Sequence, residues 1–250
     1  MGDLTFLREN FSRVGWFIPP YIRLGALGQI AKDIQDRGGQ FSADDLERAL
    51  GLIYDAGGMA AMVSERYPLT PCIRDYQVTI GEAVEAHFLG LDHVAVSGLI
   101  PVIEGAGRQL AQVRGLSATT VKDVFKSLAA DCKQEAIAKR LGDFEEVASM
   151  MDSFSSFTTD YLYVNSGSYP GADGTNRHGI LHGAYADTHY GRPLNFYKTV
   201  AAVDFLTFVS SFRANLSWLA PSTTSQSIEL ARYYVTLSRL KRLKPHGEAG

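Results

Sequence analysis

Apolar residues recur at helical spacing along almost the whole chain, in segments that glycines and prolines separate. Leu46, Leu50 and Ile53, for example, follow one another at intervals of three or four residues, which places their side chains on one face of an α-helix. The sustained alternation of apolar and polar residues that is typical of half-buried strands is missing, and so are Asn-Gly hairpin turns. The sequence therefore predicts an all-α fold.

Capping residues, prolines and glycines predict where the helices begin and end. Ser42 is a good N-cap, and the pair Gly57-Gly58 predicts a kink or an end in the segment that follows it. We expect Pro71 to open a helix and Asp92 to cap the next one. The expected helices cover residues 21–36, 42–67, 71–89, 92–115, 119–141, 143–164, 194–216 and 225–243, and a further helix starts at Thr175 or Asn176.

Length and charge limit the classes of protein that the chain can belong to. With 250 residues it can bury one large core, and we expect residues 67–250 to form a helical bundle that a helical region over residues 1–66 covers on one side. A net charge of −3 does not suit a protein whose whole surface binds nucleic acid. Any contact with RNA is therefore expected to be a local patch.

Cysteine use and hydropathy indicate a cytoplasmic protein. Cys72 and Cys132 lack the spacing of metal ligands and suit reduced, buried thiols. We expect no signal peptide, because no charged start precedes a long apolar run. We also expect no contact with a membrane, since the most apolar stretch, residues 199–212, is short and contains Asp204.

The segment over residues 176–183, of sequence NRHGILHG, concentrates ionisable side chains after a turn-rich loop at 165–174. If the segment is helical, His178 and His182 share a face one turn apart, and Arg177 can lean over the same groove. An arginine presents a fork of donors that suits a phosphate, and a histidine can take and return a proton near neutral pH. Arg177 and His182 are thus a minimal set of groups for cleaving a phosphodiester without a metal.

A second candidate pair lies earlier in the chain. Glu104 sits in a run of small and apolar residues, so its carboxylate is expected to be nearly buried and to need a partner. Arg108 follows four residues later, which is the better orientation for an ion pair along a helix. We expect Glu104 and Arg108 to form a structural pair that supports the site and does not contact substrate.

The order of Arg177, His178 and His182 resembles the motif of the HEPN (higher eukaryotes and prokaryotes nucleotide-binding) superfamily, in which an arginine and a polar residue precede a histidine. A softer likeness joins residues 99–105, of sequence LIPVIEG, and a helix opening with Leu194 and Asn195. Together they look like bacterial HEPN-type proteins with an extra helical N-terminal region. The likeness covers about residues 70–215.

This resemblance implies a HEPN-type helical bundle with additional N-terminal and C-terminal helices, often assembled as a homodimer that brings two motifs together. Its catalytic members are metal-independent endoribonucleases of toxin and anti-phage defence systems. They need no cofactor and leave 2′,3′-cyclic phosphate ends. The implied partners are RNA and an antitoxin or another defence-system protein.

Carried onto this chain, the resemblance assigns a role to each residue of the motif. His182 would act as general base on the ribose 2′-OH or as general acid on the leaving 5′-oxygen, and Arg177 would stabilise the transition state. Asn176 and His178 would bind substrate by orienting the phosphate, or would orient the catalytic histidine. Some HEPN toxins are switched off by modification of a tyrosine two residues after the histidine, but Ala184 occupies that position here, next to Tyr185.

Three other interpretations of the same residues stay open, and in the simplest of them His178 and His182 only fill positions of an amphipathic helix. His178 and His182 could hold zinc with His189 or Asp187 as a third ligand, although neither a cysteine pair nor the glutamate of a helical metalloprotease motif accompanies them. Alternatively, the chain is a non-catalytic HEPN-like scaffold that binds a protein partner or a nucleotide. Exposure separates the scaffold from the enzyme, because an open groove at Arg177 and His182 favours catalysis.

Overall fold

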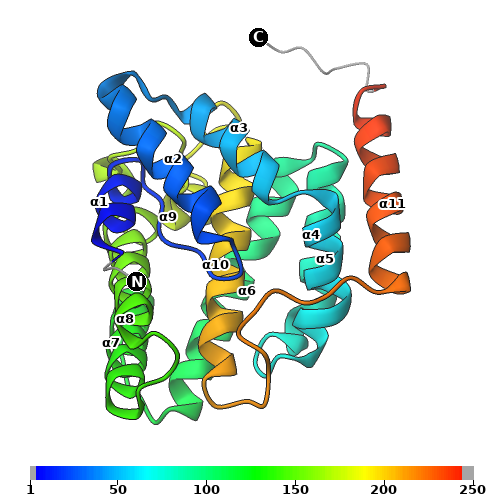
Figure 1. The fold of residues 1–250 in the computed structure, drawn as a ribbon. Coiled ribbons are helices and arrows are strands. Elements are labelled where there is room, and N and C mark those ends of the chain that lie inside the picture. Colours follow the sequence, from blue (N-terminus) through cyan, green and yellow to red (C-terminus); the bar gives the residue numbers. More distant parts are fainter. Residues whose placement is uncertain (1–3, 244–250) are drawn as a thin grey trace.

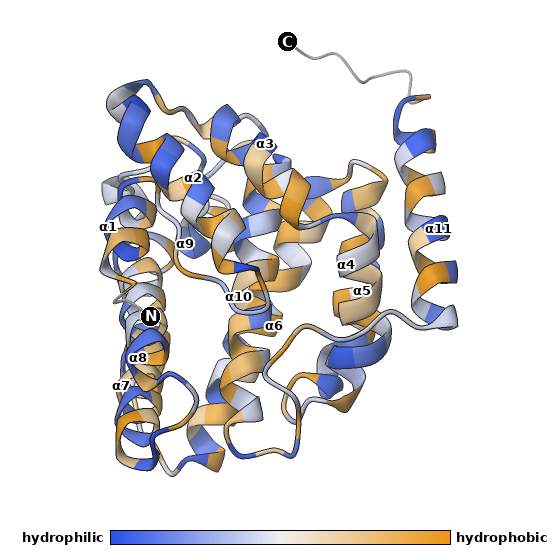
Figure 2. Ribbon diagram, in the orientation of Figure 1, coloured by the Kyte–Doolittle hydropathy of each residue, from blue (hydrophilic) through white to orange (hydrophobic). Residues whose placement is uncertain are grey.

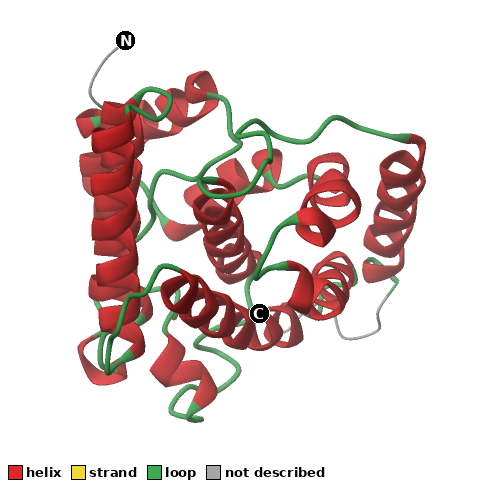
Figure 3. Ribbon diagram, turned by 90° about the horizontal axis from the view of Figure 1, so that it is seen from below, coloured by secondary structure: helices red, strands yellow, loops and turns green. Residues whose placement is uncertain are grey.

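A computed structural model describes residues 4–243, and this part of the chain contains eleven α-helices and no strand (Figures 1 and 3), which confirms the all-α prediction. The α-helices are α1 (Thr5–Arg13), α2 (Leu24–Arg37), α3 (Ala43–Ile53), α4 (Ala56–Ala61), α5 (Gln77–Phe88), α6 (Asp92–Val113), α7 (Val121–Lys139), α8 (Phe144–Phe157), α9 (Arg177–Leu181), α10 (Pro193–Ser211) and α11 (Ser225–Lys241). Turns of π-helix extend α4 and α8, over Met62–Arg66 and Thr158–Leu162. Short 3-10 turns lie at Gly38–Gln40, Tyr67–Leu69, Arg74–Tyr76 and Ser166–Ser168.

Helix α10 runs through the middle of the molecule (Figure 1). Every residue of α10 from Leu194 to Ser211 is buried, which is the behaviour of a helix that is apolar on nearly all sides. Helices α6 and α3 pack against it, and Figure 2 shows hydrophobic colours along both α6 and α10. The core of the fold is therefore built around α10.

The other helices surround this centre in two groups. On one side the antiparallel pair α7 and α8 carries α1, and α2 packs on α1 in turn. On the other side α5 packs along α6, and α11 covers α4 and α5 (Figure 1).

Among residues 4–243, none of the helices is both long enough and apolar enough to cross a bilayer.

A local capping signal placed the start of α3 correctly. The Ser42 hydroxyl accepts a hydrogen bond from the amide of Asp45, and the Asp45 carboxylate accepts one from the Ser42 amide, so α3 begins as predicted. The break expected at Gly57-Gly58 lies earlier, because α3 ends at Ile53 and the Asp55 side chain caps α4. Both glycines lie inside the first turns of α4.

Two predicted helix starts were wrong. The helix expected from Pro71 begins only at Gln77, because the chain before it forms separate 3-10 turns. Asp92 is the first residue of α6 and not its cap, a position that Leu91 holds. The Asp92 carboxylate instead binds Nδ1 of the buried His87 at 2.5 Å. A contact with α5 therefore replaces the expected cap on the amides of α6.

Candidate active site

Asn176 fastens the short helix α9 to the chain that follows α8. Its side-chain oxygen accepts a hydrogen bond from the Gly179 amide at 2.8 Å, which makes Asn176, and not Thr175, the N-cap of α9. Its side-chain nitrogen donates to the carbonyl oxygens of Tyr161 and Val164, at 3.0 and 2.9 Å. Asn176 is completely buried and offers no surface to a substrate. It therefore positions the motif, in place of the substrate contact expected from the sequence.

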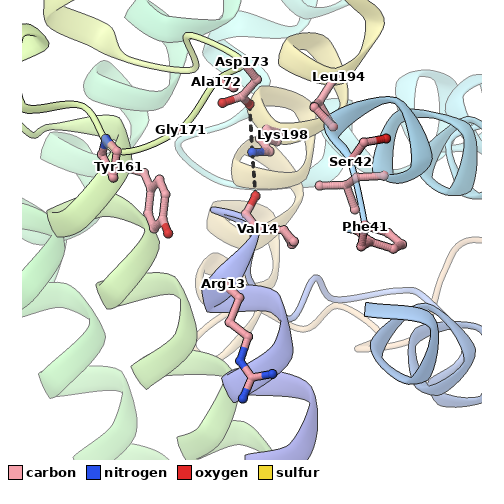
Figure 4. Close-up of a pocket in the computed structure, with 13 residues that line it drawn as sticks. Arg13, Val14, Phe41, Ser42, Tyr161, Gly171, Ala172, Asp173, Leu194 and Lys198 are labelled. Atoms are coloured by element: carbon pink, nitrogen blue, oxygen red, sulfur yellow. Dashed lines mark hydrogen bonds and ion pairs between the residues drawn. The ribbon is translucent and has the colours of Figure 1, made fainter. Parts of the chain in front are cut away.

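A buried ion pair holds the loop that leads into α9. Lys198, on α10, lies 2.8 Å from the Asp173 carboxylate and also donates to the carbonyl oxygen of Val14 at 3.0 Å, as the dashed lines in Figure 4 show. The hydroxyls of Tyr169 and Thr175 donate to the same carboxylate at 2.5 and 2.7 Å. Burial would raise the pKa of Asp173, but the Lys198 charge and these hydrogen bonds outweigh it and lower that pKa. The loop is thus tied to the central helix immediately before the motif.

The two glycines of the motif shape a single tight helical turn. A Cβ atom at Gly179 would lie 2.2 Å from the ring of Tyr185, so only glycine allows that ring to pack on α9. The Tyr185 amide also donates to the Gly179 carbonyl oxygen at 3.0 Å, which folds the chain back over the helix. Gly183, at φ +67°, ends the turn after His182.

Glu104, Arg177 and His182 form a chain of polar contacts between α6 and α9. Nε of Arg177 donates to the Glu104 carboxylate at 2.6 Å, and its Nη1 lies 2.6 Å from Nε2 of His182. The side chains of Arg177 and Glu104 are 20% and 16% exposed, and His182 is exposed. The Arg177–His182 pair is therefore accessible from solvent and not sealed inside the fold.

The contact with Arg177 gives Nε2 of His182 the role of an acceptor. A guanidinium has only donors, so a hydrogen bond between the two side chains runs from Arg177 to Nε2 of His182. An accepting ring nitrogen is also what a general base needs. Nη2 of Arg177 has no hydrogen-bond partner among residues 4–243, so it is free to receive an anion.

The predicted ion pair between Glu104 and Arg108 is not formed. Glu104 binds Arg177 instead, and Arg108 is exposed and makes no hydrogen bond or ion pair within the described chain. The reason is tertiary, because α9 packs on α6 and brings the Arg177 guanidinium within 2.6 Å of the carboxylate. Glu104 thus supports the site as expected, but through a different partner.

His178 lies beside the pair without completing it. Its ring stands 5.6 Å from that of His182, so the prediction that the two histidines share a face is confirmed. Nδ1 of His178 lies 3.4 Å from Nη1 of Arg177. Burial and the neighbouring Arg177 charge lower the pKa of His178, which keeps this imidazole neutral near pH 7.

A cavity of about 300 Å³ opens directly beside the motif. Its lining comes from α7, the turn after α8, and α9, and consists of Thr120, Val121, Lys122, Tyr163, Arg177 and His178. Sequence reasoning missed Lys122 and Tyr163, because they lie far from the motif along the chain and carry no motif of their own. Only the packing of α7 and α8 against α9 places them here.

The zinc site considered from the sequence is not assembled. Nδ1 of His189 accepts a hydrogen bond from the Ala186 amide at 3.2 Å, and its ring stacks on Tyr185. Within residues 4–243 no three His, Cys, Asp or Glu side chains are grouped closely enough to hold a metal ion. His178 and His182 therefore lack the third ligand that this interpretation needs.

Comparison with known proteins assigns no family to this chain, so the candidate site is described from its geometry. The fold class is all-α, and the likeness to the HEPN superfamily rests on the residues of the sequence motif alone. No protein-family model matches the chain, and neither a curated protein nor a solved structure is a significant match to it.

Proposed function

We propose that this chain is a metal-independent endoribonuclease of HEPN type. The observation that carries the proposal is the Glu104–Arg177–His182 chain of contacts, which joins a carboxylate, a guanidinium and an exposed imidazole beside a cavity. Glu104 fixes the direction of the Arg177 fork, and Arg177 keeps hydrogen-bond capacity for a phosphate. The arrangement contains a proton acceptor and an anion stabiliser in direct contact.

The proposed reaction is an in-line transfer within one RNA strand. His182 takes the proton from a ribose 2′-OH, and the 2′-oxygen forms a bond to the adjacent phosphorus. The bond from phosphorus to the 5′-oxygen breaks, and that oxygen gains a proton from solvent. Arg177 donates to the non-bridging oxygens, on which negative charge builds up in the transition state. One product ends in a 2′,3′-cyclic phosphate and the other in a 5′-OH.

Substrate binding would release His182 from its resting contact. A bound phosphate competes for the donors of Arg177, because a charged acceptor binds a guanidinium more strongly than a neutral imidazole nitrogen does. Nε2 of His182 then becomes free to accept the 2′-OH proton. His178, held neutral by its lowered pKa, can hydrogen-bond the phosphate without adding a competing charge.

The resemblance extends the proposal to assembly and biological role. HEPN proteins often dimerise through the region of the motif, and the exposure of His182 leaves room for a second protomer to approach. A toxin or anti-phage defence role, with an antitoxin or another defence-system protein as partner, belongs to the same proposal. These points rest on the family likeness and not on a contact within this chain.

A non-catalytic scaffold is the second candidate, and one observation favours it. The Arg177–Glu104 ion pair joins α9 to α6 within a single chain and stabilises the fold whether or not RNA is cleaved. In a scaffold, replacing His182 would leave the affinity for a protein partner unchanged. A cleavage assay therefore separates the scaffold from the ribonuclease.

The test is incubation of the purified protein with a mixed pool of structured and unstructured RNAs in EDTA. We expect cleavage that leaves 2′,3′-cyclic phosphate ends and falls by at least about 100-fold in His182→Ala, since a general base contributes about 10²–10⁴ to a rate. His189→Ala is the matched control, because His189 is exposed in the same segment but makes no contact with Arg177. A folded wild-type protein that cleaves no RNA would favour the scaffold.

A further inference from the structure

The cavity beside α9 carries positive charge that the proposed reaction does not use. Lys122 donates to the Thr159 carbonyl oxygen at 2.8 Å but forms no ion pair within the described chain. Arg108, which lies one turn after Glu104 on α6, is outside the cavity lining, but it is exposed and forms no ion pair among the described residues. Its charge acts on Tyr163, where it opposes the rise of that residue's pKa. The Glu104 carboxylate is already paired with Arg177, and the Asp123 carboxylate accepts the hydroxyl of Thr120. Within the described residues neither Lys122 nor Arg108 forms an ion pair, so both charges are available to an anion.

Tyr163, in the wall of the same cavity, holds a buried donor that is not satisfied. The residue is only 6% exposed and lines the cavity, yet its hydroxyl has no hydrogen-bond partner. Its ring is held in place by stacking on Phe125, with the ring centres 5.3 Å apart. Burial raises the pKa of Tyr163, so the hydroxyl keeps its proton and can donate it to an acceptor. A buried hydroxyl without a partner costs free energy, which a ligand in the cavity would recover.

The start of α7 favours the same kind of ligand. Thr120, the N-cap, and Val121, the first helical residue, both line the cavity. The N-terminus of a helix of 19 residues presents free amide groups and the positive end of the helix dipole, and both attract anions. The cavity volume of about 300 Å³ is at the lower end of the range for ligand pockets, about 300–1,000 Å³.

We propose that this cavity is a subsite for a second backbone phosphate of RNA, next to the phosphate that Arg177 holds, with Lys122, Arg108 and the Tyr163 hydroxyl as its donors. The inference rests on the proposed function for the identity of the strand. It does not rest on cleavage, because the subsite would bind the backbone of an RNA that cannot be cut. It also supplies the local basic patch that a chain of net charge −3 needs to bind RNA.

The test uses a fluorescein-labelled, single-stranded 2′-O-methyl RNA of twelve nucleotides, which has no 2′-OH to react. Its affinity for the intact protein is measured by fluorescence anisotropy between 50 and 200 mM salt. For Lys122→Gln and for Arg108→Gln we expect weaker binding and a salt slope that is smaller by about 0.7, the value for one phosphate contact on a single strand. Lys126→Gln, which removes an exposed charge one turn further along α7, should leave the slope unchanged.

Tyr163→Phe provides a readout that does not depend on charge. It keeps the ring that stacks on Phe125 and removes only the unpaired hydroxyl, so the urea midpoint should stay the same or rise. Affinity for the RNA should fall by at least about twofold.

The outcomes separate this inference from the proposed function. Equal effects of Lys122→Gln and Lys126→Gln would indicate diffuse attraction and overturn the subsite, as would an unchanged affinity in Tyr163→Phe or a wild-type protein that does not bind the oligonucleotide. Binding that depends on Lys122 while the wild type cleaves no RNA would instead support the subsite and reject the ribonuclease.

Discussion

Replacing Asp204 with asparagine would show how the core responds to pH. Asp204 lies in the middle of α10, only 3% exposed, and its carboxylate accepts a hydrogen bond from the Tyr67 hydroxyl at 2.6 Å. Burial raises the pKa of Asp204 to about 7, and the hydrogen bond from Tyr67 and the charge of Arg66 oppose that rise only in part. Asparagine keeps the shape and an acceptor for Tyr67 but carries no charge at any pH.

The sign and size of the effect follow from linkage between protonation and folding. Below pH 3.8, the ordinary pKa, the carboxyl is protonated in both the folded and the unfolded chain. Between about pH 4 and pH 7 the unfolded chain loses the proton while the folded protein keeps it, so the free energy of unfolding falls as pH rises. Above the raised pKa of about 7 the folded protein also carries the buried charge, and the free energy of unfolding is lowered by its full amount. The difference of about three units between the folded and the ordinary pKa corresponds to about 4 kcal/mol.

Urea unfolding followed by circular dichroism measures this directly at pH 5, 6, 7 and 8. Relative to the wild type, Asp204→Asn should gain about 2–3 kcal/mol between pH 5 and pH 8. Other carboxylates are present in both proteins and cancel in the difference. Asp36→Asn, at an exposed position near the end of α2, should show no such trend. A stability difference between the two proteins that does not change from pH 5 to pH 8 would refute the raised pKa of Asp204.

Two further predictions concern the anchoring of the motif, and urea unfolding with the EDTA cleavage assay checks both. Asn176→Ala removes the N-cap of α9 and the hydrogen bonds to the carbonyl oxygens of Tyr161 and Val164, so we expect a loss of about 2–4 kcal/mol and of cleavage. Lys198→Met leaves the buried Asp173 without a counter-charge, at a cost of about 3–5 kcal/mol, and adding Asp173→Asn should restore part of it. A stability equal to that of the wild type in either single variant would contradict the structural role given to that residue.

The charged side chains of α10 show what sequence patterns do not predict. The apolar faces predicted a strong helix in this segment, and α10 forms from Pro193 to Ser211. Because the whole helix is buried, its charged residues must each find a partner, and those partners come from other elements. Lys198 finds Asp173 and Val14, and Asp204 finds Tyr67. No spacing along the chain indicates these pairings.

For Glu104, at the candidate site, the sequence likewise predicted the need for a partner but not which residue the partner is. The sequence indicated that this carboxylate needs a partner, which is correct, because an acid in an apolar run is costly without one. Helical spacing favoured Arg108, four residues away, but the carboxylate binds Arg177 of α9. The cavity depends on packing in the same way, since Lys122 and Tyr163 line it together with Arg177 only through the arrangement of α7 and α8.

The sequence by itself determined the fold class, most of the helices and the Arg177–His182 motif. Each of these depends on interactions within a few residues, such as the 3.6-residue period, the N-caps and the one-turn spacing of His178 and His182. Tertiary structure alone decided the partner of Glu104, the burial of Asn176 and the charges around the cavity. These depend on which helix faces meet, and that is decided by burial of apolar surface over the whole chain.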